Sequence, residues 1–190
     1  MAKVTVYADL VMHVGGTGGG QVDTNLVAFK FSLPSIVGTV TGARLHMNVY
    51  SRDTPAVSNL VSKTSLDNTW NSASSGADIV AIGMTAGIET IVAGSLPASG
   101  DVSWDVHTTG ANSIDTAYAG TPGSFTVVID SNATTSTAST RQETSSIEFA
   151  EDSTTYIALL DGPTDATPPY LEIEYTPAAG GDTEQFFKFF

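Results

Sequence analysis

The sequence contains no cysteine, so disulfide bonds, thiolate metal ligands and thiol catalysis are all excluded. Cations are scarce as well: there are 7 Lys and Arg against 20 Asp and Glu, and the formal net charge is −13. Nucleic acids and anionic membrane surfaces are bound by clustered Lys and Arg. We therefore expect neither as a partner of this protein.

Long apolar runs are missing too, and without a stretch of about 18 such residues no membrane-spanning helix is expected. The first residues, Met-Ala-Lys-Val-Thr-Val-Tyr, lack the apolar segment and cleavage site of a signal peptide. This favours a protein that is made and assembled inside a cell, and a processed chain is the alternative.

The 190 residues suit one large domain, and charged residues make up only 14% of them. Thr, Ser and Gly take the place of charge, and β-branched stretches alternate with Gly, Ser, Asn and Asp. Such a composition is typical of a β-sandwich or β-barrel with many turns.

Period-two alternation predicts the strands, and residues 43–50 show it most cleanly. The glycines of residues 15–20 predict a flexible loop, because the Gly-Lys-Ser/Thr of a phosphate-binding loop is absent. For residues 78–96 we expect two short strands, with a short helix as the alternative. Eleven segments are candidates, and about nine or ten strands among them are expected; they predict an all-β, jelly-roll-like, two-sheet antiparallel sandwich. The candidates are residues 4–10, 26–31, 43–50, 59–63, 79–84, 89–92, 101–106, 125–129, 147–149, 156–160 and 170–175.

Five motifs resemble those of a known family. Residues 26–36 and 40–50 are similar to its "LLRFDLSSIP" and "ITSATLRLYV" segments. Residues 69–71 are similar to "VTWN", residues 102–106 to "VSFDVT", and residues 168–175 to "PPYLEVTY". The family is that of the DNRLRE-type β-sandwich modules, which are related to carbohydrate-binding modules and are also called TGF-β-propeptide-like. The resemblance implies a jelly-roll sandwich of the kind found in surface, adhesive, polysaccharide-binding and structural proteins.

Catalytic patterns are weak, and we expect no enzyme. The three histidines, His13, His46 and His107, have no spacing that predicts a zinc site, and no Gly-x-Ser-x-Gly motif is present. Asp9, Asp130 and Asp161 flank strand ends and are candidate ligands of a structural Ca²⁺, with ordinary turn hydrogen bonding as the alternative. No other cofactor is expected.

Aromatic side chains suggest a glycan surface. Trp70, Tyr50 and Tyr118 are candidates for stacking on sugars. Trp104 alternates with Val102 and Val106, so we expect it in the core.

The C-terminal segment suggests a role in assembly. We expect residues 1–176 to form the sandwich and residues 177–190 to form a flexible spacer with a docking tail. Four of the eight phenylalanines lie in the last five residues, as Phe186, Phe187, Phe189 and Phe190. Exposed aromatic residues are typical interface anchors, although the tail could instead fold back onto its own sandwich.

These observations predict a structural or adhesion subunit of a larger assembly, such as a virion component or a surface filament. Its partners would be further copies of the chain or other structural proteins of the particle. The alternative function is that of a secreted carbohydrate-binding module with a polysaccharide as its partner.

Overall fold

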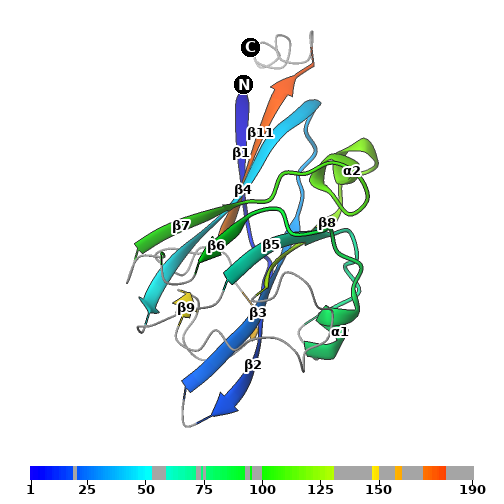
Figure 1. Cartoon of the computed structure of the whole chain (residues 1–190). Helices are drawn as coiled ribbons and strands as arrows, with labels where there is room; N and C mark the ends of the chain where they lie inside the picture. The colour runs from blue at the N-terminus through cyan, green and yellow to red at the C-terminus, as the bar shows by residue number, and fades with distance from the viewer. Residues whose placement is uncertain are drawn as a thin grey trace, which may run out of the picture.

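The computed structural model describes residues 1–18, 21–52, 59–71, 74, 76–92, 95, 100–130, 147–149, 157–159 and 169–178. Within these ranges eleven strands and two short helices are found (Figure 1). The strands are β1 (Ala2–Tyr7), β2 (Leu10–Gly18), β3 (Gln21–Ser32), β4 (Gly38–Arg52), β5 (Asn59–Ser65), β6 (Thr90–Val92), β7 (Gly100–Asp105), β8 (Ser124–Asp130), β9 (Ile147–Phe149), β10 (Ile157–Leu159) and β11 (Tyr170–Pro177). The helices are α1 (Gly76–Ala81) and α2 (Ile114–Ala119).

The strands form two antiparallel sheets. Sheet A has the order β1-β11-β4-β7, with β9 also paired to β4, and sheet B has the order β10-β2-β3-β8-β5-β6. Four nested pairs, β1/β11, β3/β8, β4/β7 and β5/β6, generate this order. Such nesting of first with last and second with next-to-last is the connectivity of a jelly roll. The predicted two-sheet sandwich is therefore confirmed, and β2, β9 and β10 are additions to its eight main strands.

The core lies between the two sheets. Along β3, β4, β7 and β11, alternate described residues point inward, as the pleat requires, and most of them are almost completely buried. The predicted core position of Trp104, on β7, is confirmed. The main contributors are Val27, Phe29 and Phe31 of β3, Ala43, Leu45 and Met47 of β4, Phe125, Val127 and Ile129 of β8, and Leu171 and Ile173 of β11.

The predicted first strand, residues 4–10, is in fact two strands in different sheets. β1 ends at Tyr7 in sheet A, and β2 begins at Leu10 in sheet B. The chain bends between them, where the Ala8 amide donates to Pro169 O at 3.1 Å and the Asp9 amide to Lys30 O at 2.7 Å. These two hydrogen bonds satisfy the backbone amides at the bend, where the chain passes from sheet A to sheet B.

Residues 15–18, predicted as part of a flexible loop, belong to β2. They pair with residues 21–24 of β3 in an antiparallel ladder. Glycine has no side chain to pack, but its amide and carbonyl still complete the ladder, so the glycine-rich composition does not prevent a strand. The β2–β3 ribbon consequently extends beyond the part of sheet B that β8 and β10 cover.

The strand predicted at residues 79–84 is wrong, and the short-helix alternative is closer to the structure. Ile79 lies in α1 and Ile82 directly after it, and both are buried. A separation of three residues places the two side chains on one side of a helical turn, whereas a strand would place them on opposite faces. The second helix, α2, was not predicted; it begins after Ser113, whose hydroxyl accepts from the Thr116 amide.

Neither helix has the length or the apolar character needed to cross a membrane, and this finding concerns the described residues alone.

Replacing Gly38 by alanine is expected to destabilise the fold by about 1–3 kcal/mol. Gly38 has a φ of +155°, and a Cβ placed there would lie 2.2 Å from the carbonyl oxygen of Thr176 on β11. Gly123→Ala is the matched control, because a Cβ at Gly123 would meet nothing within 4 Å. Urea unfolding of both variants checks this, and equal stability of the two would contradict it.

Candidate functional site

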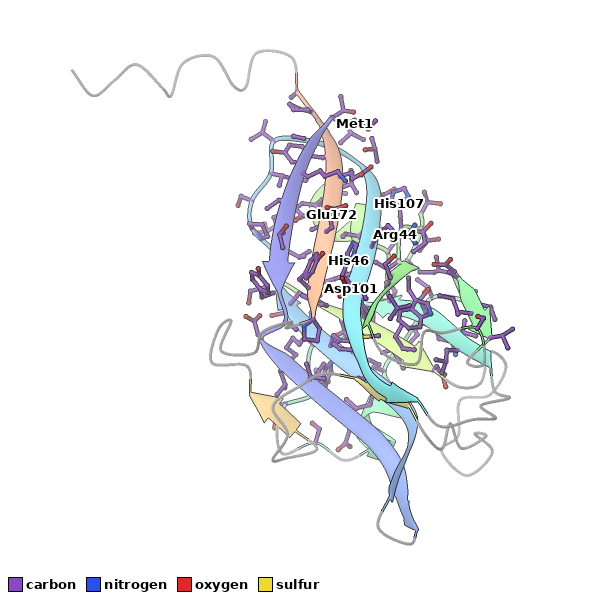
Figure 2. All side chains as sticks on the ribbon, turned by 90° about the vertical axis from the view of Figure 1, so that its left-hand side faces the viewer. Met1, Arg44, His46, Asp101, His107 and Glu172 are labelled. Atoms are coloured by element: carbon purple, nitrogen blue, oxygen red, sulfur yellow. The ribbon has the colours of Figure 1, made fainter. Side chains whose placement is uncertain are left out.

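The outward side chains of sheet A form three rows across its strands. We call this surface the outer face of sheet A (Figure 2). The strand pairing sets the rows: Tyr7, Tyr170, His46 and Ser103 in the first, Thr5, Glu172, Arg44 and Asp105 in the second, and Lys3, Glu174 and Gly42 in the third. The face is thus assembled from β1, β11, β4 and β7, which are far apart in the sequence.

The first row is aromatic. The His46 and Tyr170 rings are stacked, with centroids 4.6 Å apart and an interplanar angle of 5°, and Tyr7 meets Tyr170 edge-on at 6.0 Å. Stacking between neighbouring strands makes the two rings stand upright on the sheet. Their faces therefore contact each other, while Tyr7, 45% exposed, is the most accessible ring.

This packing favours the neutral form of His46. Its Nε2 atom is buried and has no hydrogen-bond partner among the described residues. Burial is the main cause that lowers the pKa of His46 below its usual value, because desolvation disfavours the imidazolium; the nearby Glu172 opposes this. The ring therefore acts mainly as an apolar neighbour of Tyr170 at neutral pH.

The charges on the outer face of sheet A are paired across strands. Lys3 Nζ lies 2.8 Å from carboxylate oxygens of both Glu172 and Glu174, and the Arg44 Nε donates to Ser103 Oγ at 3.2 Å. The Lys3 hydrogen bond lowers the pKa of Glu174, and the two carboxylates raise the pKa of Lys3. Ion pairs at the surface add little stability, so their main effect is to balance charge on this face.

The outer face of sheet B is covered by the chain itself. A second apolar cluster lies there, in which Trp70, Ile79 and Ile82 pack on residues of β2, β3 and β8. Sheet B supplies Leu10, Ala28 and Val128 to it, and Met84 packs at its margin. Sheet A therefore presents its outer face, whereas sheet B has the segment around α1 packed on part of its own.

Trp70, predicted to stack on sugars, is 1% exposed and belongs to this cluster. Its Nε1 donates to Thr126 Oγ1 at 2.9 Å, and Lys30 Nζ lies 4.8 Å from its ring centroid. Lys30 also donates to the carbonyls of Asn68 and Trp70, which fixes the backbone on both sides of Thr69. The proposed glycan role of Trp70 is therefore wrong: its ring has no accessible face.

The other two glycan candidates do not extend this surface. Tyr118 is half-buried against the main core, and its hydroxyl has no hydrogen-bond partner among the described residues. Burial raises the pKa of Tyr118 to about 12. The side chain of Tyr50 lies outside the described residues.

The three candidate calcium ligands do not form a site in the described structure. Asp130 is fully buried and its Oδ2 lies 2.8 Å from Lys63 Nζ, so a cation already neutralises it. Asp9 is exposed at the bend between β1 and β2, and Asp161 lies outside the described residues. The part of the chain that the structure describes contains no group of three His, Asp or Glu residues suited to a metal ion.

Two of the three histidines have described side chains. His107 lies with its Nε2 3.1 Å from Asp115 Oδ1, and His46 lies on the outer face of sheet A. The side chain of His13 is outside the described residues. The docking residues Phe186, Phe187, Phe189 and Phe190 also lie outside them.

Sequence reasoning missed the aromatic row. The signal was present in part, since Tyr7, His46 and Tyr170 all occupy outward positions of alternating strands. Their meeting depends on β1, β11 and β4 being neighbours, which alternation within one strand does not reveal. Compared with known proteins, the chain matches no family model and no curated protein.

Proposed function

We propose that this protein is a non-enzymatic structural or adhesion subunit that docks into a larger assembly through its C-terminal aromatic tail. The likeness to DNRLRE-type modules, which is also a proposal, agrees with such a role. Virion components and surface filaments are the assemblies that fit it. The observation that carries the proposal is the position of the last described strand, β11, in the middle of sheet A.

β11 is paired with β4 over residues 170–177 and with β1 over residues 170–175. Its end is fixed as well, because the Ala178 amide donates to Val37 O at 3.2 Å and Gly38 packs on Thr176. A pull on the residues that follow would load two ladders of hydrogen bonds at once. β11 is therefore a firm attachment point for a C-terminal segment that holds a subunit in an assembly.

The sandwich is also polarised. Ala2 pairs with Tyr175, so the start of β1 and the end of β11 lie at one end of the sandwich, whereas the β2–β3 ribbon extends at the other (Figure 1). Attachment at the first end leaves the second end and the outer face of sheet A directed outward. Those surfaces are available for a neighbouring subunit or an adhesion target.

The carbohydrate-binding alternative loses its main residue with the burial of Trp70. A glycan site would have to use Tyr7 and the outer face of sheet A. The upright, mutually stacked rings of His46 and Tyr170 offer edges, whereas sugars stack on ring faces. We therefore place this function second.

Replacing Phe186, Phe187, Phe189 and Phe190 together by serine is expected to abolish assembly, because aromatic anchors supply most of the energy of such contacts. Sedimentation velocity of the full chain checks this, with Lys188→Ser as the control in the same segment. We expect fast-sedimenting species for the wild type and the control, and at low concentration a monomer without such species for the serine variant. A monomeric wild type that bound a polysaccharide in a glycan screen would contradict the proposal and favour the alternative.

A further inference from the structure

We propose that the free edge of β1 pairs with β1 of a second copy, antiparallel and centred on Thr5, so that sheet A continues from one subunit into the next. The inference rests on the proposed function, which it deepens by naming a second copy as the partner and β1 as the contact.

Among the described strands, β1 has an open edge along its whole length. It pairs with β11 on one side only, and no hydrogen bond to its other side is found in the described parts of the chain. Open edges invite pairing with another strand, and proteins usually protect them with prolines, bulges, inward charges or short strands. The six residues of β1, Ala-Lys-Val-Thr-Val-Tyr, have one protective feature, the charge of Lys3, and Glu172 and Glu174 of the same chain balance that charge.

The outermost described strands at the other three edges are short or partly bonded to side chains, although β2 continues past β10 and is also open at residues 13–18. At the opposite edge of sheet A, the Asp105 amide of β7 is bound by the Glu89 carboxylate and its carbonyl accepts from Ser62 Oγ at 2.6 Å. The edge strands of sheet B, β6 and β10, have three residues each.

The pleat of β1 restricts how two copies can pair. Lys3, Thr5 and Tyr7 point outward, whereas Val4 and Val6 pack toward the core. Outward residues must face outward residues, since a slip by one position would reverse the two faces. Pairing centred on Thr5 satisfies this requirement and places the two Thr5 residues opposite each other on the two-fold axis.

In this register the side chains are complementary. Lys3 lies opposite Tyr7 of the second copy, which allows a cation–π contact, and Val4 lies opposite the second copy's Val6, which extends the core. No like charges face each other directly, despite the net charge of −13 on each chain. Lys3 also remains beside Glu172 and Glu174 of its own chain, whose charges it balances.

An edge of this length gives a small contact, at or below the ~1,000 Å² of a specific stable interface. We therefore expect a weak dimer in dilute solution. In an assembly that already holds subunits together, the high effective concentration would make the same contact persistent.

A single introduced cysteine tests the pairing, because the chain has no other thiol. Directly opposed residues of antiparallel strands have Cα atoms about 4.5 or 5.5 Å apart, and both separations suit a disulfide. Thr5→Cys in the full chain is expected to form covalent dimers at least ~10-fold faster than Thr39→Cys, since a preformed contact raises the effective thiol concentration. Thr39 is the matched control, an exposed threonine on β4 of the same sheet.

The register has its own test. An equimolar mixture of Lys3→Cys and Tyr7→Cys chains should form mixed dimers faster than either variant forms dimers with itself. All variants are first checked for wild-type unfolding in urea. Thr5→Cys chains that cross-link no faster than Thr39→Cys chains would overturn the inference.

The outcome is separable from that of the proposed function. If the wild type assembles and loses assembly with the serine-substituted tail while Thr5→Cys behaves like its control, the edge pairing is wrong and the assembly role stands. If Thr5→Cys cross-links rapidly even with the serine-substituted tail, the edge pairing is supported independently of that role.

Discussion

Trp70→Ala is expected to lower the free energy of unfolding by about 3–5 kcal/mol, the cost typical of removing a large buried aromatic side chain. Trp70 is the largest member of the cluster on the outer face of sheet B. Its removal would leave a cavity under α1, take away the ring beneath Lys30 and leave the Thr126 hydroxyl without its indole donor. Urea unfolding followed by circular dichroism measures the loss.

Two further variants separate the parts of this effect. Trp70→Phe keeps most of the apolar volume but not the indole N–H, so its loss should be clearly smaller. Thr126→Val removes the acceptor of the indole N–H, together with the hydroxyl's own donation to Asp67 O or Asn68 Oδ1. It should cost about 1–3 kcal/mol, the penalty for unsatisfied buried polar groups. If Trp70→Ala left stability unchanged and removed binding to a polysaccharide, Trp70 would be a ligand residue, and its buried position would be contradicted.

Asp130→Ala is expected to destabilise the protein by about 3–5 kcal/mol, because it leaves the buried Lys63 without its carboxylate. Lys63 on β5 and Asp130 on β8 are separated by 67 residues in sequence, and their side chains are 10% and 0% exposed. Removing one partner of a buried ion pair leaves the other charge buried without compensation. The resulting loss of stability exceeds the net stabilisation that the intact pair provides. Thermal and urea unfolding at pH 7 check the size of the effect.

The double variant Lys63→Met with Asp130→Leu is the control. It removes both charges and replaces them by side chains of similar volume, so most of the lost stability should return. A double variant as unstable as Asp130→Ala would show that the wider polar environment matters more than the mutual neutralisation of this pair.

The fold was largely predictable because its strands are amphipathic. Apolar residues alternate along residues 43–50 and 26–31 because one face of each strand packs against the core. The structure confirms these segments as parts of β4 and β3. The prediction was wrong where the local pattern of apolar residues was compatible with both a strand and a helix. Ile79 and Ile82 fit a strand or a helical turn, and the choice depended on sheet B needing an apolar cover at that position.

The functional residues were predicted less well, for a physical reason. Trp70 follows a polar turn and precedes a Ser-rich stretch, which suggested exposure, yet it is buried by Leu10, Ala28 and Val128 from distant parts of the chain. Asp130 at a strand end has the pattern of a turn or metal ligand, and only the pairing of β5 with β8 brings Lys63 to it. Such contacts join residues that are far apart in the sequence and that only the strand order brings together. The sequence around each residue therefore does not predict them.

The most direct test of the assembly role is the molar mass in solution, measured by light scattering over a range of concentrations. The full chain is compared with a version that ends at Ala178, whose hydrogen bond to Val37 keeps the end of β11 in place. We predict a multimer or a larger particle for the full chain and, at low concentration, a folded monomer for the shortened one. A full chain that stays monomeric at every concentration and binds no sister subunit would contradict the account.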